Sequence, residues 1–107
     1  MGKRKIDNFK FIENKNYRNV TFCKRKNGII KKAIELSRLC GVDVYMMIMD
    51  KHKRKLVQFT STSDFDSARV ANIVQNIDNQ KYKREFFSNQ DYTRFRNENQ
   101  IEHVESE

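Results

Sequence analysis

Apolar residues recur at the period of an α-helix between residues 15 and 40, and no proline interrupts them. Five of them, separated by seven, four, three and four residues, fall within about 60° of each other on a helical wheel. They are Phe22, Ile29, Ala33, Leu36 and Cys40. Asn14 is a suitable N-cap, and Gly41 can adopt the left-handed conformation that ends a helix. The pattern therefore predicts one long helix over residues 15–40.

The pattern changes after Gly41, because residues 42–49 are almost continuously apolar. Their length and β-branched content favour a strand that is covered on both faces. A polar, basic turn at 50–54 leads to a second short strand at 56–61, so we expect a hairpin with a basic tip. Two strands cannot bury a two-sided strand alone, which indicates a partner chain that extends the sheet.

Helical spacing returns over residues 64–77, where Ser63 and Asp66 resemble a capping box. We expect a second amphipathic helix there, on the other face of the sheet. Residues 79–107 are polar with scattered aromatic residues, and we expect them to be partly ordered or not ordered at all.

Charge sets the first third of the chain apart. The 107 residues are enough for one domain, but with 37% hydrophobic and 34% charged residues the core is small, which favours oligomerisation. Residues 1–32 hold eleven basic and two acidic residues, a net charge of +9, while the whole chain has +8. Such a block either solubilises a surface or contacts nucleic acid or anionic lipid. Its density, with apolar spacing beside it, favours nucleic acid.

Several classes of protein fit the composition poorly. Cys23 and Cys40 lack the spacing of a zinc site, so we expect no metal, no other cofactor and two reduced thiols that are buried or half-buried. No apolar run is long enough to cross a membrane. The acids of residues 1–40 are scattered, which argues against an enzyme such as a metal-dependent nuclease. Non-specific RNA binding remains open on composition alone, although no aromatic RNA platform is evident.

Three stretches together resemble the MADS box: GKRKI at residues 2–6, KFIENK at 10–15, and RNVTFCKRKNGIIKKAIELSRLC at 18–40. The similarity continues through the apolar strand and covers residues 2–62. The segment 11–15 and Gly41 are more similar to the serum response factor branch than to the myocyte enhancer factor branch. After residue 62 the resemblance weakens.

This resemblance implies an α+β fold in which the long helices of two subunits pair across the DNA minor groove, with the sheet and then the second helices above them. It implies a nuclear, sequence-specific transcription regulator that binds A/T-rich, CArG-like double-stranded DNA. The partner would be a second copy or another MADS-box chain, with accessory transcription factors at the sheet edge and second helix. Residues 1–62 would bind DNA and dimerise, 63–78 would extend the dimer or partner surface, and 79–107 would be a polar tail.

The resemblance also implies roles for individual residues. The arm with Gly2, Lys3, Arg4 and Lys5 would enter the minor groove, and Lys15 and Arg18 would begin the helix near DNA. Lys24 would read base edges, as lysine does at guanine, while phosphates would be held by Arg25, Lys31 and Lys32. We expect the dimer interface to include Ile29, Ala33, Leu36, Val44, Met46, Ile48 and Phe59.

Gly28 stands apart because it lies in the middle of the predicted helix. Glycine there costs about 1 kcal/mol relative to alanine. Either another backbone or DNA comes close at this point, or the helix tolerates a weak position, and the sequence leaves both interpretations open.

Overall fold

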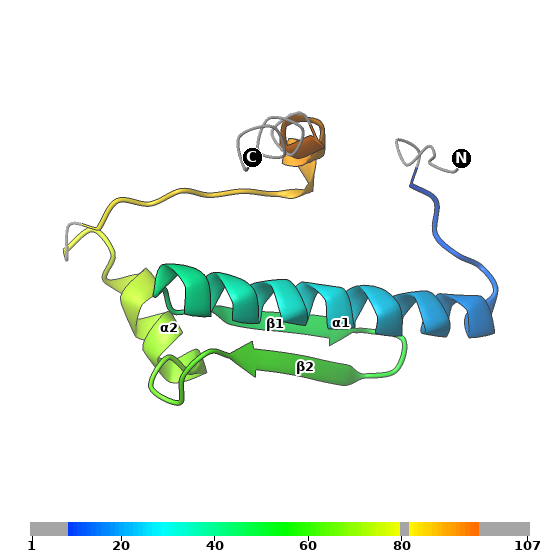
Figure 1. Ribbon diagram of the computed structural model, residues 1–107, viewed down its shortest axis with the longest axis horizontal. Helices are drawn as coiled ribbons and strands as arrows, with labels where there is room; N and C mark the ends of the chain where they lie inside the picture. Colours follow the sequence, from blue (N-terminus) through cyan, green and yellow to red (C-terminus); the bar gives the residue numbers. More distant parts are fainter. Residues whose placement is uncertain (1–8, 80–81, 97–107) are drawn as a thin grey trace. The chain divides into compact units, whose positions relative to one another are not determined.

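The computed structural model describes residues 9–79 and 82–96, in two compact units, Met1–Gln75 and Asn76–Glu107. The elements follow each other as α1 (Lys15–Cys40), β1 (Tyr45–Asp50), β2 (Lys55–Thr60), α2 (Ser67–Gln75) and the short 3-10 helix η1 (Asn89–Asp91) (Figure 1). A long helix, an antiparallel hairpin and a further helix confirm the predicted α+β class. The predicted arm residues Gly2, Lys3, Arg4 and Lys5 lie outside the described residues.

Helix α1 spans the predicted residues because both of its ends are capped. The side-chain oxygen of Asn14 accepts the backbone N–H of Tyr17 at 2.8 Å, while Asn14 itself is extended. At the other end, Gly41 has a φ of 66° and its N–H donates to the carbonyl of Ser37 at 2.9 Å. Glycine adopts this left-handed conformation without a steric penalty, so the helix stops there.

The two strands form one antiparallel hairpin in which Tyr45 pairs with Thr60. Strand β1 begins three residues later than predicted, because the chain must first leave the Gly41 cap. The pairing nevertheless extends beyond the strand. The N–H of Val44 donates to Ser61 Oγ at 2.9 Å, and the N–H of Ser61 donates to the Val44 carbonyl at 2.9 Å.

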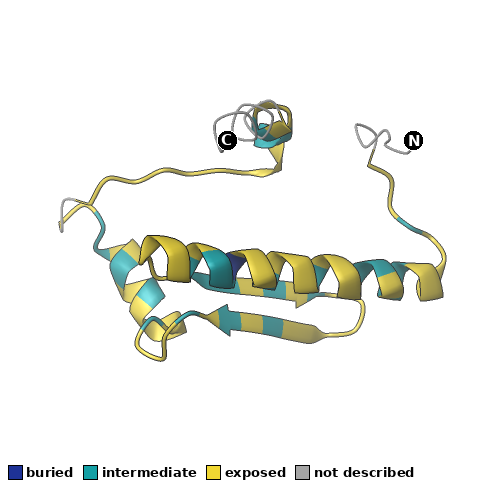
Figure 2. Cartoon of the chain, viewed as in Figure 1, coloured by how far each residue is buried: buried dark blue, intermediate teal, exposed yellow. Residues whose placement is uncertain are grey.

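Half-buried and exposed positions alternate along the hairpin strands (Figure 2), so its two faces differ in how far they are covered. Directly opposite residues in an antiparallel pair share a face. The face toward α1 carries four half-buried side chains: Met46, Ile48, Val57 and Phe59. On the other face, Met47, Met49 and Leu56 are 51%, 57% and 44% exposed. The sequence pattern of a two-sided strand is present, but one chain covers only one side of it.

Some apolar residues of helix α1 are covered and others are exposed to solvent. Phe22 is half-buried and Ala33 is buried, as the predicted stripe requires. Three other members of that stripe remain exposed: Ile29, Leu36 and Cys40. Half-buried positions next to the stripe are instead taken by Ile30 and Ile34. The hairpin therefore covers one edge of a broad apolar sector and leaves the other edge open.

Helix α2 is shorter than the predicted span of 64–77, and its cap differs from the one expected. The carboxylate of Asp66 accepts the N–H of Arg69 at 2.9 Å. A capping side chain accepts from the N–H two or three residues after it, so the cap is Asp66. The prediction of a capping box at Ser63 is therefore wrong, and the helix begins at Ser67.

The described part of the chain has very little buried core. Ala33, 7% exposed, is its one buried apolar residue. Leu39 is 84% exposed and Val20 is 52% exposed, both on α1. A domain normally gains most of its stability from buried apolar area. The single chain therefore leaves apolar surface available for a partner.

The described residues of the second unit are ordered locally. Ser88 caps η1, with its side chain and that of Asp91 forming a capping box. The rings of Phe87 and Phe95 meet edge to face at 5.2 Å, and the guanidinium carbon of Arg94 lies 5.2 and 5.1 Å from their centroids. These contacts join residues that are close in sequence.

Candidate nucleic-acid interface

One exposed sector of α1 combines four basic side chains with a bare position at its centre. Residues three and four apart are neighbours on a helix surface. The neighbours of Gly28 by this spacing are all basic and all exposed: Lys24, Arg25, Lys31 and Lys32. A Cβ added at Gly28 would find no atom within 4 Å. We call these four residues and Gly28 the basic sector. Its centre, at Gly28, exposes the helix backbone, and the four surrounding cations attract anions.

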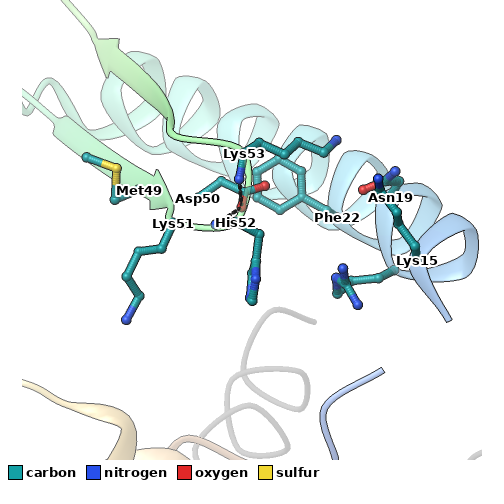
Figure 3. A pocket seen from close by; sticks show the side chains of 9 residues that line it. Lys15, Asn19, Phe22, Met49, Asp50, Lys51, His52 and Lys53 are labelled. Atoms are coloured by element: carbon teal, nitrogen blue, oxygen red, sulfur yellow. Dashed lines mark hydrogen bonds between the residues drawn. The ribbon is translucent and has the colours of Figure 1, made fainter. Parts of the chain in front are cut away.

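A second group of bases lies where the start of α1 meets the hairpin tip. The two elements enclose a cleft of about 290 Å³. Figure 3 shows Lys15, Asn19 and Phe22 of α1 on one side, facing the residues of the tip. Its lining is completed by Arg18 on α1 and by Met49, Asp50, Lys51, His52 and Lys53 on the hairpin. The fold thus brings basic residues of the tip next to the predicted DNA-binding residue Lys15.

The conformation of the hairpin tip is held by its own side chains. Asp50 Oδ1 accepts the backbone N–H of His52 at 3.1 Å and that of Lys53 at 3.3 Å. Arg54 then has a φ of 54°, in the left-handed region that a tight turn requires. Sequence reasoning recognised a basic tip but did not assign it to the site. Its lysines at 51 and 53 become candidates only when the fold places them beside α1.

Arg18 differs from the other predicted DNA-binding residues, because its guanidinium is used within the chain. It is half-buried, and its Nη1 donates to the carbonyls of Ile12 at 3.0 Å and Glu13 at 3.3 Å. Its guanidinium carbon lies 4.9 Å from the ring centroid of Phe11. Lys15, by contrast, is exposed.

The predicted dimer residues fall into two groups. On α1, Ile29 and Leu36 are 49% and 51% exposed, so they are open to a partner. The others lie largely inside the unit: Ala33 is buried, and the half-buried ones are Val44, Met46, Ile48 and Phe59. These residues pack within one chain, so they would stabilise the surface that forms the dimer interface as well as contribute to it.

The remaining expectations from the sequence concern metal ligands, thiols and membrane spans in the described ranges 9–79 and 82–96. No three His, Cys, Asp or Glu residues gather there as metal ligands would. Both cysteines are free, but Cys23 and Cys40 are exposed, so the expectation of buried or half-buried thiols is wrong for the single chain. They lie outside the edge of α1 that the hairpin covers. The same ranges contain no helix with the length and apolar character of a membrane span.

Comparison with known proteins shows which family this part of the chain resembles. Residues 11–59 match the family of SRF-type transcription factors, described as a DNA-binding and dimerisation domain. The match begins with the segment that contacts Arg18 and ends in β2. It therefore covers α1, the hairpin tip and almost all of the hairpin.

Three relatives illustrate the similarity. Transcription factor mef2A of Dictyostelium discoideum is 42% identical over 94 residues, which is 88% of this chain and 8% of the relative. Developmental protein SEPALLATA 2 of Arabidopsis thaliana is 47% identical over 64 residues, or 60% and 25% of the two chains. MADS-box transcription factor 34 of Oryza sativa subsp. japonica is 38% identical over 91 residues, or 85% and 33%.

The chain thus spans from 8% to 33% of the length of these relatives. What is shared is the domain and not the whole protein. The family model, the relatives and the order of helix, hairpin and helix agree with the resemblance found in the sequence. Through residues 11–59, the chain belongs to the SRF-type, or MADS-box, family of transcription factors, whose members are not enzymes.

Proposed function

We propose that the chain is a sequence-specific transcription regulator that acts in the nucleus and binds A/T-rich, CArG-like double-stranded DNA as a dimer. The basic sector on α1 carries this proposal. Four exposed cations surround a glycine above which the chain leaves open space. A DNA backbone can approach such a surface closely, and the cations neutralise its phosphates. No side chain at position 28 would hold the duplex away.

The resemblance to the MADS box divides the roles among the cations of the site by their positions. Lys24 reads base edges, a role that suits lysine because it can donate to guanine O6 and N7. Phosphates are held by Arg25, Lys31 and Lys32. Residues 2–5 enter the minor groove, whose negative potential is strongest in narrow A/T tracts.

The hairpin tip extends this phosphate-binding surface. Lys51 and Lys53 line the same cleft as Lys15. A DNA strand that passes the start of α1 would therefore also pass the hairpin tip. The Asp50 side chain fixes the backbone of the turn that carries them. A fixed turn presents its lysines at lower entropic cost than a free loop. We therefore include Lys51 and Lys53 among the phosphate contacts.

Dimerisation covers the apolar surface that one chain leaves exposed. Ile29 and Leu36 lie on the open edge of α1 and would meet the same residues of a second copy. The outer hairpin face, with Met47, Met49 and Leu56, would be covered in the same assembly. A lone two-stranded hairpin is marginal in water, so this cover stabilises the fold as well as the interface. Another MADS-box chain can take the place of the second copy, and accessory factors would dock at the sheet edge and α2.

In vitro selection from random duplexes, with the mass of the bound species measured in parallel, tests the function. We expect an A/T-rich box with G·C pairs at its edges and a protein mass of twice 12.9 kDa. If a dimer neutralises on the order of ten phosphates, the log–log salt slope is roughly −9. Selected sites without an A/T-rich consensus contradict the proposal.

A competition experiment separates this function from general binding of RNA. Single-stranded RNA and single-stranded DNA of the same length compete with the selected duplex. A duplex regulator should lose little binding to either competitor at equal concentration. Equal competition by single strands would favour a non-specific RNA-binding protein instead, because such binding depends mainly on backbone charge and stacking.

A further inference from the structure

Arg18 joins the start of α1 to the segment that precedes it. One guanidinium nitrogen donates to two successive carbonyls, those of Ile12 and Glu13, at 3.0 and 3.3 Å. The same guanidinium lies 4.9 Å from the Phe11 ring centroid. Arginine suits this position because its planar group stacks on a ring while it donates hydrogen bonds from its edge. Residues 11–13 are thus held against the helix by one side chain.

The hairpin tip contacts the same aromatic ring. The imidazole of His52 lies 5.7 Å from Phe11 between ring centroids, at an interplanar angle of 34°. Phe11 therefore connects three parts of the unit: the segment before α1, the first turn of α1 and the hairpin tip. The His52 backbone is itself fixed by Asp50. We call Phe11, Arg18 and His52 the arm clamp.

We propose that the arm clamp sets the direction in which the N-terminal arm leaves α1, and that Arg18 is a positioning residue and not a phosphate ligand. The inference deepens the proposed function, since the arm it positions is the one assigned to the minor groove. Arg18 cannot hold a phosphate with the same donors without releasing the carbonyls of residues 12 and 13. Holding residues 11–13, where the arm leaves the helix, removes beforehand part of the conformational freedom that binding to DNA would otherwise cost.

The clamp makes Arg18→Lys a revealing substitution. Lysine keeps the charge, so a side chain that attracts phosphate by its charge alone would lose little. It lacks the planar group, however, and its ammonium cannot both stack on Phe11 and keep the guanidinium geometry toward two carbonyls. We expect Arg18→Lys to lower the affinity for an A/T-rich box by about two- to twelvefold per arm, the range for ordering one flexible side chain. The ratio of affinities for A/T-rich and G/C-rich duplexes should fall with it.

A double-mutant cycle with deletion of residues 2–8 tests whether Arg18 acts through the arm. Once the arm is deleted, Arg18→Lys should change DNA affinity less than twofold. Arg38→Lys is the matched control, the same change on the same helix at an exposed position outside the proposed DNA contacts, and its effect should be equal in both backgrounds. Equal loss from Arg18→Lys with and without the arm would overturn the proposal. Phe11→Leu should behave as Arg18→Lys does and serves where that variant fails to form a dimer.

A second measurement needs no DNA. The imidazole protons of His52 should show a ring-current shift from Phe11 in the free protein. Phe11→Leu removes this shift, and Arg18→Lys should reduce it, because the ring loses its support. An unchanged His52 signal in Arg18→Lys contradicts the clamp even if DNA binding is weaker. If the wild-type protein binds no A/T-rich duplex, the regulator proposal fails, while this signal still decides whether the clamp exists.

Discussion

Ala33 and Ile29 stand one helical turn apart on α1, yet Ala33 is 7% exposed and Ile29 is 49% exposed. Residues four apart share a side of a helix, so the hairpin reaches only as far as one of them. Leu36, the next apolar residue on the open edge, is 51% exposed. The uncovered edge, with Ile29 and Leu36, is a suitable surface for the partner of a dimerisation domain.

Leu36→Glu should therefore separate the dimer while the chain's own packing stays intact. A carboxylate buried in an apolar interface costs several kcal/mol, so we expect the dimer to weaken by on the order of 3 kcal/mol or more, above 100-fold. Sedimentation without DNA measures the change. Asn27→Glu is the control, because it adds the same charge nine residues away, about half a turn around the helix. A dimer that survives Leu36→Glu unchanged would place the interface elsewhere.

The local signals explain how much of the fold the sequence predicts. The sequence predicts helix α1 over its observed residues because Asn14 and Gly41 are strong signals for the two ends of a helix. Helix α2 begins three residues later than the predicted residue 64, because Asp66, which the sequence places as the acidic partner of a capping box at Ser63, is itself the cap. Periodicity located the apolar sector of α1. It could not show which edge meets the hairpin, because that depends on contacts between distant residues.

Replacing the Asn14 cap tests the end signal directly. Asn14→Ala removes the acceptor of the Tyr17 N–H and should lower the free energy of unfolding by about 0.5–2 kcal/mol per chain. Urea unfolding at fixed protein concentration measures it. Asn16→Ala, an exposed position within the first turn, provides the control and should change stability by less than about 0.5 kcal/mol. Equal losses in both variants would mean that the cap contributes nothing specific.

Lys24 and Lys31 should differ in kind although both are exposed lysines on the basic sector. Lys24→Ala should cost about 1–3 kcal/mol at the preferred box and relax the choice of base pair at its edges. Lys31→Ala should weaken all duplexes about equally and reduce the salt slope by roughly 1.8, one phosphate in each of two chains. Binding curves on the consensus and on edge variants, over a salt series, distinguish the two. Identical behaviour would remove the base-reading role from Lys24.

The hairpin tip should contribute to affinity without contributing to sequence choice. Lys53→Ala removes a cation from the cleft beside Lys15, so binding should weaken on every duplex and the salt slope should fall by roughly 1.8. Lys83→Ala is the control, since it removes the same charge from the second compact unit. An equal effect of the two substitutions would indicate general attraction by net charge and not a contact at the tip.

The candidate site was only partly predictable, for a physical reason that Arg18 and Lys53 illustrate. The resemblance to the MADS box implies DNA-binding roles for Lys24, Arg25, Lys31 and Lys32, and all four are exposed on α1. Lys53 is distant in sequence and comes to lie beside Lys15, at the start of the same helix, only through the hairpin. Arg18 has the right residue type and position, yet its donors reach the carbonyls of the preceding segment. Residue type states what a side chain can bind, and the fold decides what it reaches first.

Gly28→Ala gives the most direct test of why a glycine stands in the middle of α1. Within the chain there is open space above it, so alanine fits and should stabilise the helix by about 1 kcal/mol. The four bases around it attract a duplex to the same spot, where an added methyl group would hold the backbone back. We therefore expect a more stable protein that binds its box at least tenfold more weakly, measured by urea unfolding and by titration with DNA. Gain of stability with unchanged DNA affinity would show that Gly28 is only a weak position in the helix, and that the duplex does not approach there.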